Sequence, residues 1–127
     1  VIDMVSEFNL EDYVVYSSFN HDSIGLIKQI KADAEVAYLA GDYHRCMDGI
    51  GKYGGMTIHP AQWGMPINKG DVENIRNAGF CVRMWNGSEP LYGQLRTLPD
   101  MDLREYYRLG ATDIFTNVPE RYCENRR

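Results

Sequence analysis

The chain has 127 residues, and its 13 Lys and Arg against 18 Asp and Glu give a formal net charge of −5. This length predicts one domain, and a hydrophobic content of 44% with nine Tyr, four Phe and two Trp excludes an intrinsically disordered chain. The acidic balance excludes nucleic acid as an expected partner, and no apolar run approaches the ~20 residues of a membrane helix. We expect a soluble protein with no membrane span, with the cytoplasm slightly favoured over secretion. Because the chain begins at Val1 rather than at Met, we also expect it to be a piece of something longer.

The early and middle segments alternate between helical and strand-like patterns. Apolar residues within 1–10 predict the end of a helix, Asn20 can cap a helix that carries Ile24, Ile27 and Ile30, and Asn68 can cap one that ends at Gly79. Short β-branched or aromatic runs predict strands at 13–17, 35–39, 57–59 and 80–85. The glycine-rich stretch 49–55 lacks the spacing of a phosphate-binding loop, and we interpret it as a mobile loop.

The last third repeats the pattern. A helix is expected to start near Pro99 and Asp100 and to end at Gly110, with a final strand at 113–116. Parallel strands need crossover connections, and helices between strands supply them, so this alternation predicts a parallel α/β fold. The better runs give four main strands, and 127 residues is about half of the ~250 of a closed (β/α)8 barrel.

Few residues are grouped in a way that indicates catalysis. The cysteines Cys46, Cys81 and Cys123 are widely spaced, so neither a zinc site nor a disulfide framework is predicted. Asp100 and Asp102 are better explained by helix capping than by metal binding, so this chain is expected to hold no metal. The basic residues at 121, 126 and 127 are interpreted as part of a solvated tail.

The three histidines lie on different predicted elements. His21 is expected to be an exposed first-turn residue, and His44 has no motif partner. His59 precedes Pro60 at the end of a strand, where a functional role and a structural hydrogen bond are both open. Phe19 and Trp85 follow or end strands as well, where ligand contact and core packing are both open.

Three collinear segments carry a family resemblance. The first comprises Val14-Val15-Tyr16-Ser17-Ser18-Phe19-Asn20 with the helix and strand that follow it, the second is Ala78-Gly79-Phe80-Cys81-Val82-Arg83-Met84-Trp85, and the third is Gly110-Ala111-Thr112-Asp113-Ile114-Phe115-Thr116-Asn117-Val118-Pro119. In this order they resemble the C-terminal half of the glycerophosphodiester phosphodiesterase family, which adopts a TIM-barrel fold. The resemblance covers about 1–119, which we interpret as a half-barrel domain followed by a tail at 120–127. The chain departs from the family at Asn86-Gly87-Ser88 and at Asn117, where the family has Thr, Asn and Asp.

The resemblance implies a division of roles between the two barrel halves. Phe19 and Trp85 would lie at the ends of strands five and seven and line the substrate cleft. The family's His-Arg pair, its Glu and Asp metal ligands, its His-Asp motif and the Glu and Lys of its fourth strand do not occur in this chain. The resemblance implies that the complete domain uses a divalent metal, Mg²⁺ or Ca²⁺, and two histidines to hydrolyse a glycerophosphodiester. The chain alone is expected to lack catalytic and metal residues.

Two functional hypotheses follow. In the first, the chain is the C-terminal portion of a phosphodiesterase of lipid metabolism, and its activity requires the absent half. In the second, it is an inactive half-barrel that acts as a binding or interaction module. Because a four-stranded half-barrel leaves strand edges unpaired, we expect a homodimer or higher association, with two copies closing an eight-stranded barrel.

Overall fold

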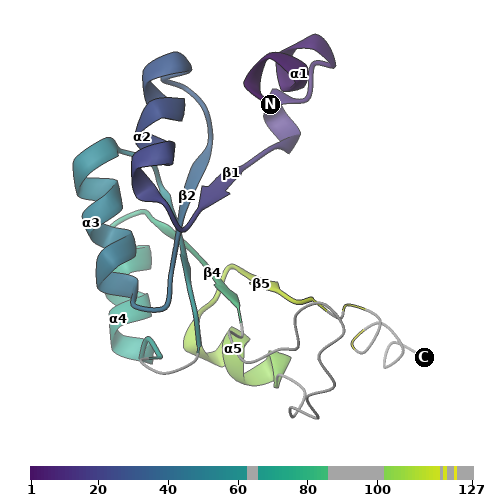
Figure 1. The fold of residues 1–127 in the computed structure, drawn as a ribbon. Helices are drawn as coiled ribbons and strands as arrows, with labels where there is room; N and C mark the ends of the chain where they lie inside the picture. The colour runs from purple at the N-terminus through teal and green to yellow at the C-terminus, as the bar shows by residue number, and fades with distance from the viewer. Residues whose placement is uncertain (63–65, 86–101, 118, 120–121, 123–127) are drawn as a thin grey trace.

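The computed structural model describes residues 1–62, 66–85, 102–117, 119 and 122 (Figure 1). Its elements are a short helix α1 (Ile2–Glu7), a 3₁₀ turn (Glu11–Tyr13), and then β1 (Tyr16–Ser18), α2 (His21–Ile30), β2 (Val36–Ala40), α3 (Tyr43–Tyr53), β3 (Thr57–Pro60), α4 (Lys69–Asn77), β4 (Cys81–Trp85), α5 (Leu103–Leu109) and β5 (Asp113–Phe115). Among these described residues, no helix has the length and apolar character needed to cross a membrane.

The five strands form one parallel sheet in sequential order, β1 to β5. The predicted parallel α/β fold is therefore confirmed, but the described part of the chain holds five strands rather than four. Five strands per copy also remove the basis of the predicted twofold closure, because two copies would supply ten strands where the barrel has eight. An association of copies stays a prediction without that geometry.

The helices begin and end where the capping residues indicate. The Asn20 side chain accepts a hydrogen bond from Asp22 N, and that of Asn68 accepts one from Asp71 N. Asp102 accepts from the amides of Arg104 and Glu105 at the start of α5, whereas Asp100 lies outside the described residues. At the other ends, Gly79 (φ 94°) and Gly110 (φ 102°) adopt the left-handed conformation that glycine tolerates best.

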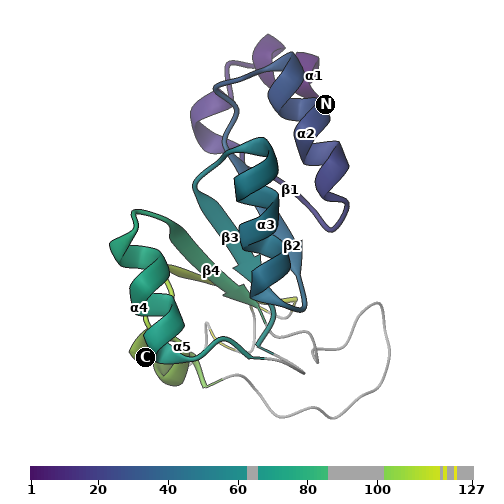
Figure 2. The same ribbon diagram turned by 90° about the vertical axis from the view of Figure 1, so that its left-hand side faces the viewer.

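The sheet has two unlike faces. Helices α2, α3 and α4 lie along one face, to the left of the sheet in Figure 1 and in front of it in Figure 2, and α5 lies beside α4. Residues that alternate along the strands point toward these helices and form the buried core, and they include Val36, Tyr38, Ile58, Val82 and Met84. The opposite face is covered by no helix among the described residues.

The glycine-rich stretch 49–55 is not the predicted mobile loop, because Gly49 and Gly51 lie within α3. A Cβ atom at Gly49 would come within 2.3 Å of Tyr38 Cδ1, so glycine lets the helix approach this fully buried ring. Gly54 ends the helix at φ 78°, and its carbonyl oxygen accepts a 2.6 Å hydrogen bond from the Tyr38 hydroxyl. The stretch therefore forms the last turns of α3 and the residues that end the helix.

Two boundaries also differ from the prediction. The first strand begins at Tyr16 rather than at residue 13, because Glu11–Tyr13 forms a 3₁₀ turn. Helix α5 begins at Leu103, after the Asp102 cap, rather than near Pro99 and Asp100. The predicted tail at 120–127 lies outside the described residues except for Tyr122, which packs against the core, and the division into domain and tail stays a prediction.

Candidate functional site

A cavity of about 900 Å³ opens on the face of the sheet that the helices leave uncovered. All five strands or the residues that follow them contribute to it, because strand side chains on one face alternate with those in the core. Its walls combine aromatic, aliphatic and polar side chains from Tyr13, Val15, Ser17, Phe19, Leu39, His59, Arg83, Trp85, Asp113, Ile114, Phe115, Thr116 and Asn117. In barrel enzymes, substrates bind at the carboxyl ends of the strands, which is where Phe19, Trp85 and Asn117 lie.

The two predicted substrate residues lie together at this end. The rings of Phe19 and Trp85 make an edge contact with a centroid distance of 5.6 Å and an interplanar angle of 76°. Trp85 is half-buried, and its indole Nε1 donates a 2.9 Å hydrogen bond to the His59 carbonyl oxygen, whereas Phe19 is 59% exposed. Neither ring belongs to the buried core. A role in substrate binding stays a prediction for both.

His59 lies deeper, with only 3% of its surface exposed. Its Nδ1 lies 2.9 Å from Ser17 Oγ, and the ring lies 4.6 Å from that of Phe115, centroid to centroid. Nε2 is buried and has no hydrogen-bond partner among the described residues. Burial, aided by the positive charge of Arg83 and opposed by Asp113, lowers the pKa of His59 to about 4, so the imidazole is neutral at pH 7. His59 therefore makes a structural hydrogen bond and also lines the cavity, and a functional role for it stays a prediction.

A charged group lies on the same face. The Arg83 guanidinium donates to Asp113 Oδ2 from Nε at 3.1 Å and to Glu35 Oε1 from Nη2 at 3.2 Å. Parallel pairing places Arg83 opposite Asp113, and the long side chain reaches across β3 to Glu35, the residue immediately before β2. Arg83 and Asp113 thus give one wall of the cavity a paired, nearly neutral ionic surface.

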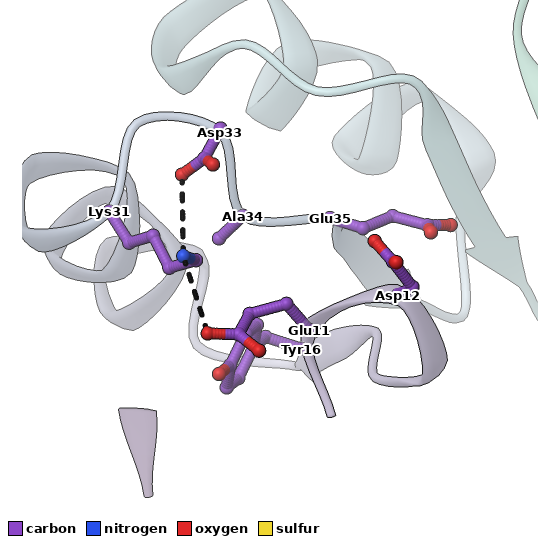
Figure 3. Close-up of a pocket in the computed structure, with 7 residues that line it drawn as sticks. All are labelled: Glu11, Asp12, Tyr16, Lys31, Asp33, Ala34 and Glu35. Atoms are coloured by element: carbon purple, nitrogen blue, oxygen red, sulfur yellow. Dashed lines mark ion pairs between the residues drawn. The ribbon is translucent and has the colours of Figure 1, made fainter. Parts of the chain in front are cut away.

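A second, smaller cavity of about 270 Å³ lies near the amino-terminal ends of β1 and β2 (Figure 3). Lys31 lies between Glu11 and Asp33, with Nζ to carboxylate distances of 3.9 and 3.7 Å (Figure 3). In barrel enzymes the active site lies at the opposite, carboxyl ends of the strands. The acidic side chains of this cavity surround a lysine. We assign this cavity no function.

The remaining candidates lie elsewhere. His21 is half-buried rather than exposed, because its Nε2 lies 2.9 Å from the Leu39 carbonyl oxygen and its ring contacts Tyr38. His44 is exposed and stacks on Tyr43 at a centroid distance of 4.0 Å. Cys46 is buried, which raises the pKa of its thiol to about 12. The loop residues Asn86-Gly87-Ser88 and Val118 lie outside the described residues.

The divalent metal implied by the resemblance finds no ligand set among the described residues, where no three His, Cys, Asp or Glu side chains are arranged to hold an ion. The carboxylates of Glu35 and Asp113 are both paired with Arg83. We therefore derive no chemical step through a metal from these residues.

The sequence analysis did not single out several residues of the cavity, among them Ser17, Arg83 and Asp113. Ser17 and His59 are 42 positions apart, and Arg83 and Asp113 are 30 apart, so only the register of the sheet brings each pair together. Arg83 could have been identified from the alternation of side chains along 80–85, because that alternation places Arg83 on the same side of its strand as Trp85.

Comparison with known proteins bears on the identity of this fold. No family model matches the chain. It is 28% identical over 122 residues to the uncharacterized protein YqiK of Bacillus subtilis, covering 95% of this chain and 46% of that protein. It is also 28% identical over 129 aligned positions to a protein of Bacillus altitudinis named glycerophosphodiester phosphodiesterase, covering 99% of this chain and 48% of that protein.

Solved structures agree on the fold. A candidate glycerophosphodiester phosphodiesterase from Galdieria sulphuraria superimposes with a TM-score of 0.74 at 18% identity, over 94% of this chain and 46% of that one. A candidate glycerophosphoryl diester phosphodiesterase from Silicibacter pomeroyi gives a TM-score of 0.67 at 21% identity, over 91% of this chain and 38% of that one.

The chain thus spans about half the length of the curated relatives it matches. If β5 is the eighth barrel strand, as the resemblance implies, Phe19 follows the fourth strand rather than the fifth, while Trp85 keeps its place at the seventh. With five parallel strands and crossover helices in place, the chain resembles the C-terminal half of the glycerophosphodiester phosphodiesterase family, as its collinear motifs predicted.

Proposed function

We propose that the chain is the C-terminal portion of a glycerophosphodiester phosphodiesterase, which hydrolyses a glycerophosphodiester to an alcohol and glycerol 3-phosphate. The observation that carries this proposal is the 28% identity over 99% of the chain to the Bacillus altitudinis protein of that name. The cavity at the carboxyl ends of the strands supports it, because substrates of barrel enzymes bind at that end.

In this proposal the chain supplies part of the substrate cleft rather than the reacting groups. A water oxygen forms a bond to phosphorus, the bond from phosphorus to the alcohol oxygen breaks, and the alcohol leaves with a proton. The groups that move these protons, and a divalent metal, would come from the other half of the domain. Phe19 and Trp85 would form an apolar wall, and the polar side chains of the cavity would contact the glycerol unit.

The test is hydrolysis of glycerophosphocholine by the purified chain with Mg²⁺ or Ca²⁺ and with a chelator control. We expect no turnover from the chain alone. Adding the segment of the Bacillus altitudinis protein that this chain does not match should restore chelator-sensitive release of choline. Turnover by the chain alone would contradict the assignment of the catalytic residues to the other half, and no activity of the mixture, despite complex formation, would contradict the proposed enzyme.

A second candidate function is a catalytically inactive binding module that self-associates. The observation that favours it is the sheet itself, whose first and last strands, β1 and β5, each pair on one side only among the described residues. Light scattering at micromolar concentration tests this candidate, and a stable, well-folded monomer would refute it.

A further inference from the structure

Three aromatic rings gather at the carboxyl ends of the strands. Phe19 follows β1, Trp85 ends β4, and Phe115 ends β5, where it pairs with Trp85 in the sheet register. All three line the larger cavity, and Phe19 and Phe115 are 59% and 43% exposed. Exposed apolar side chains that are grouped around a cavity mark a binding site, whereas single ones do not.

The rings of Phe19 and Trp85 form a corner. Their planes lie 76° apart with a centroid distance of 5.6 Å, so the two π faces point in nearly perpendicular directions. The indole of Trp85 is held in place, because its Nε1 donates a 2.9 Å hydrogen bond to the His59 carbonyl oxygen. The faces of aromatic rings are electronegative, and that of tryptophan attracts a cation most strongly.

The charges around the cavity also favour a cation over an anion. Among the described residues that line it, the basic side chains are Arg83 and His59. Arg83 pairs with Asp113 and Glu35, so this group holds formally more negative than positive charge. His59 is neutral, because burial lowers its pKa to about 4. A phosphate would therefore meet no uncompensated positive charge from these residues, whereas a cation would be attracted.

We propose that the corner between Phe19 and Trp85 binds a quaternary ammonium group, such as the trimethylammonium of a choline head group, by cation–π contact. A quaternary ammonium carries no N–H group, so it needs no hydrogen-bond acceptor, and its methyl groups pack against the apolar rings. This inference rests on the proposed function, and it adds the class of the alcohol that the diester carries.

The first test compares a cation with a neutral molecule of the same shape. Choline and 3,3-dimethyl-1-butanol, in which carbon replaces the ammonium nitrogen, are titrated against the ¹⁵N-labelled chain while the indole N–H signal of Trp85 is followed. We expect choline to shift this signal and to bind about threefold or more tightly than the neutral alcohol. Equal affinity for the two molecules, or no binding of choline, would overturn the cation site.

The second test changes only the electron density of one ring. 5-Fluorotryptophan and 5,7-difluorotryptophan at position 85 keep the size and the N–H group of the indole and make its face less electronegative in steps. We expect choline to bind about twofold more weakly at each step, with no change for 3,3-dimethyl-1-butanol. Because packing is retained, this test does not depend on a destabilised variant. An affinity for choline that fluorination leaves unchanged would remove Trp85 from the site.

The second ring is tested by substitution, since Phe19 is too exposed to be needed for folding. Phe19→Leu should weaken choline binding by about twofold to fivefold, as for one exposed cation–π contact. Phe8→Leu is the matched control, because Phe8 is 63% exposed and lies outside the cavity, and it should bind choline as the wild type does. The same affinity in Phe19→Leu as in Phe8→Leu would overturn the role of Phe19.

A diester with a neutral alcohol separates this inference from the proposed function. Glycerophosphoglycerol requires the phosphodiesterase but not the cation site. Turnover of it by the mixture of the two halves, without choline binding and without preference for glycerophosphocholine, would overturn the cation site and leave the phosphodiesterase in place. If the mixture hydrolyses neither diester while the chain still discriminates choline from the neutral alcohol, the phosphodiesterase fails and the cation site stands.

Discussion

The two faces of the sheet differ although the same strands build both. On the helix-covered face, β2 places Val36 and Tyr38 against α2 and α3, and these residues are 1% and 0% exposed. On the open face, the alternate positions of neighbouring strands carry Ser17, His59 and Arg83, which pair with polar atoms of other strands. The same alternation of side chains thus produces a packed core on one face and a polar cavity on the other. Substitutions on the covered face should change packing, whereas those on the open face should change pH dependence or ligand binding.

The largest effect is expected from acid, through His59 on the open face. Its pKa lies at about 4 in the folded chain against about 6.5 in an unfolded one, so the unfolded state binds the proton first as the pH falls. Stability should therefore decrease as the pH falls from about 6.5 to about 4, by about 3 kcal/mol from this residue. Arg83 and Asp113 are the charged groups that act on the imidazole, with opposite signs.

Urea unfolding of the wild type and of His59→Leu at pH 7 and pH 4 measures this contribution. The variant lacks the titrating group, so its free energy of unfolding should change less between the two pH values, and the difference isolates His59 from the carboxylates. Equal pH dependence in both proteins would mean that His59 is not held neutral by its surroundings.

The next effect concerns the covered face, where helix α3 approaches Tyr38. Gly49→Ala should lower the free energy of unfolding by about 2 kcal/mol, because the added methyl group overlaps the Tyr38 ring. Gly51→Ala is the matched control in the same helix, where a Cβ would meet nothing within 4 Å, and it should stabilise by about 0.5–1 kcal/mol. If both variants were stabilised, the close approach of α3 to Tyr38 would be wrong.

These two glycines also show which helix could not be predicted from the sequence. Helices α2, α4 and α5 were predictable because Asn20, Asn68 and Asp102 cap them locally. Helix α3 also has a local cap, because the Asp42 side chain accepts a hydrogen bond from His44 N, but the glycines inside the helix disfavour that structure and the sequence analysis took them for a loop. Gly49 is required by a contact with the Tyr38 ring, eleven positions earlier, which no local pattern contains.

The candidate site divides along the same line. Phe19 and Trp85 were predictable because each lies at a strand end within a recognisable motif. The pairing of Ser17 with His59, and of Arg83 with Asp113 and Glu35, depends on a five-strand register that no local pattern contains. The number of strands was the quantity that the sequence analysis did not predict correctly. That number also determines how many strands a partner must supply to complete an eight-stranded barrel.

A smaller effect on stability is expected at Trp85, at the rim of the open face. Trp85→Ala loses one hydrogen bond to the His59 carbonyl and a half-buried ring, so it should cost about 1–2 kcal/mol of unfolding free energy. Its effect on binding of glycerophosphocholine should be larger, about a hundredfold, which corresponds to ~2.7 kcal/mol. Trp85→Phe keeps a ring and should bind better than the alanine variant. A loss of about 3–5 kcal/mol in folding, with binding unaffected, would instead make Trp85 a core residue.

The smallest effect is expected at Arg83, whose side chain is 21% exposed while those of Glu35 and Asp113 are 51% and 61% exposed. Arg83→Met should cost about 0.5–1 kcal/mol at low salt and less at high salt, because partly exposed pairs are screened. The same change should raise the pKa of His59, since the Arg83 charge helps to lower it. Lys52→Met, which breaks the more exposed pair with Asp22 across the covered face, should leave both quantities unchanged. A pKa of His59 that does not move in Arg83→Met would mean that burial alone keeps the imidazole neutral, and that the open face acts on it only by excluding water.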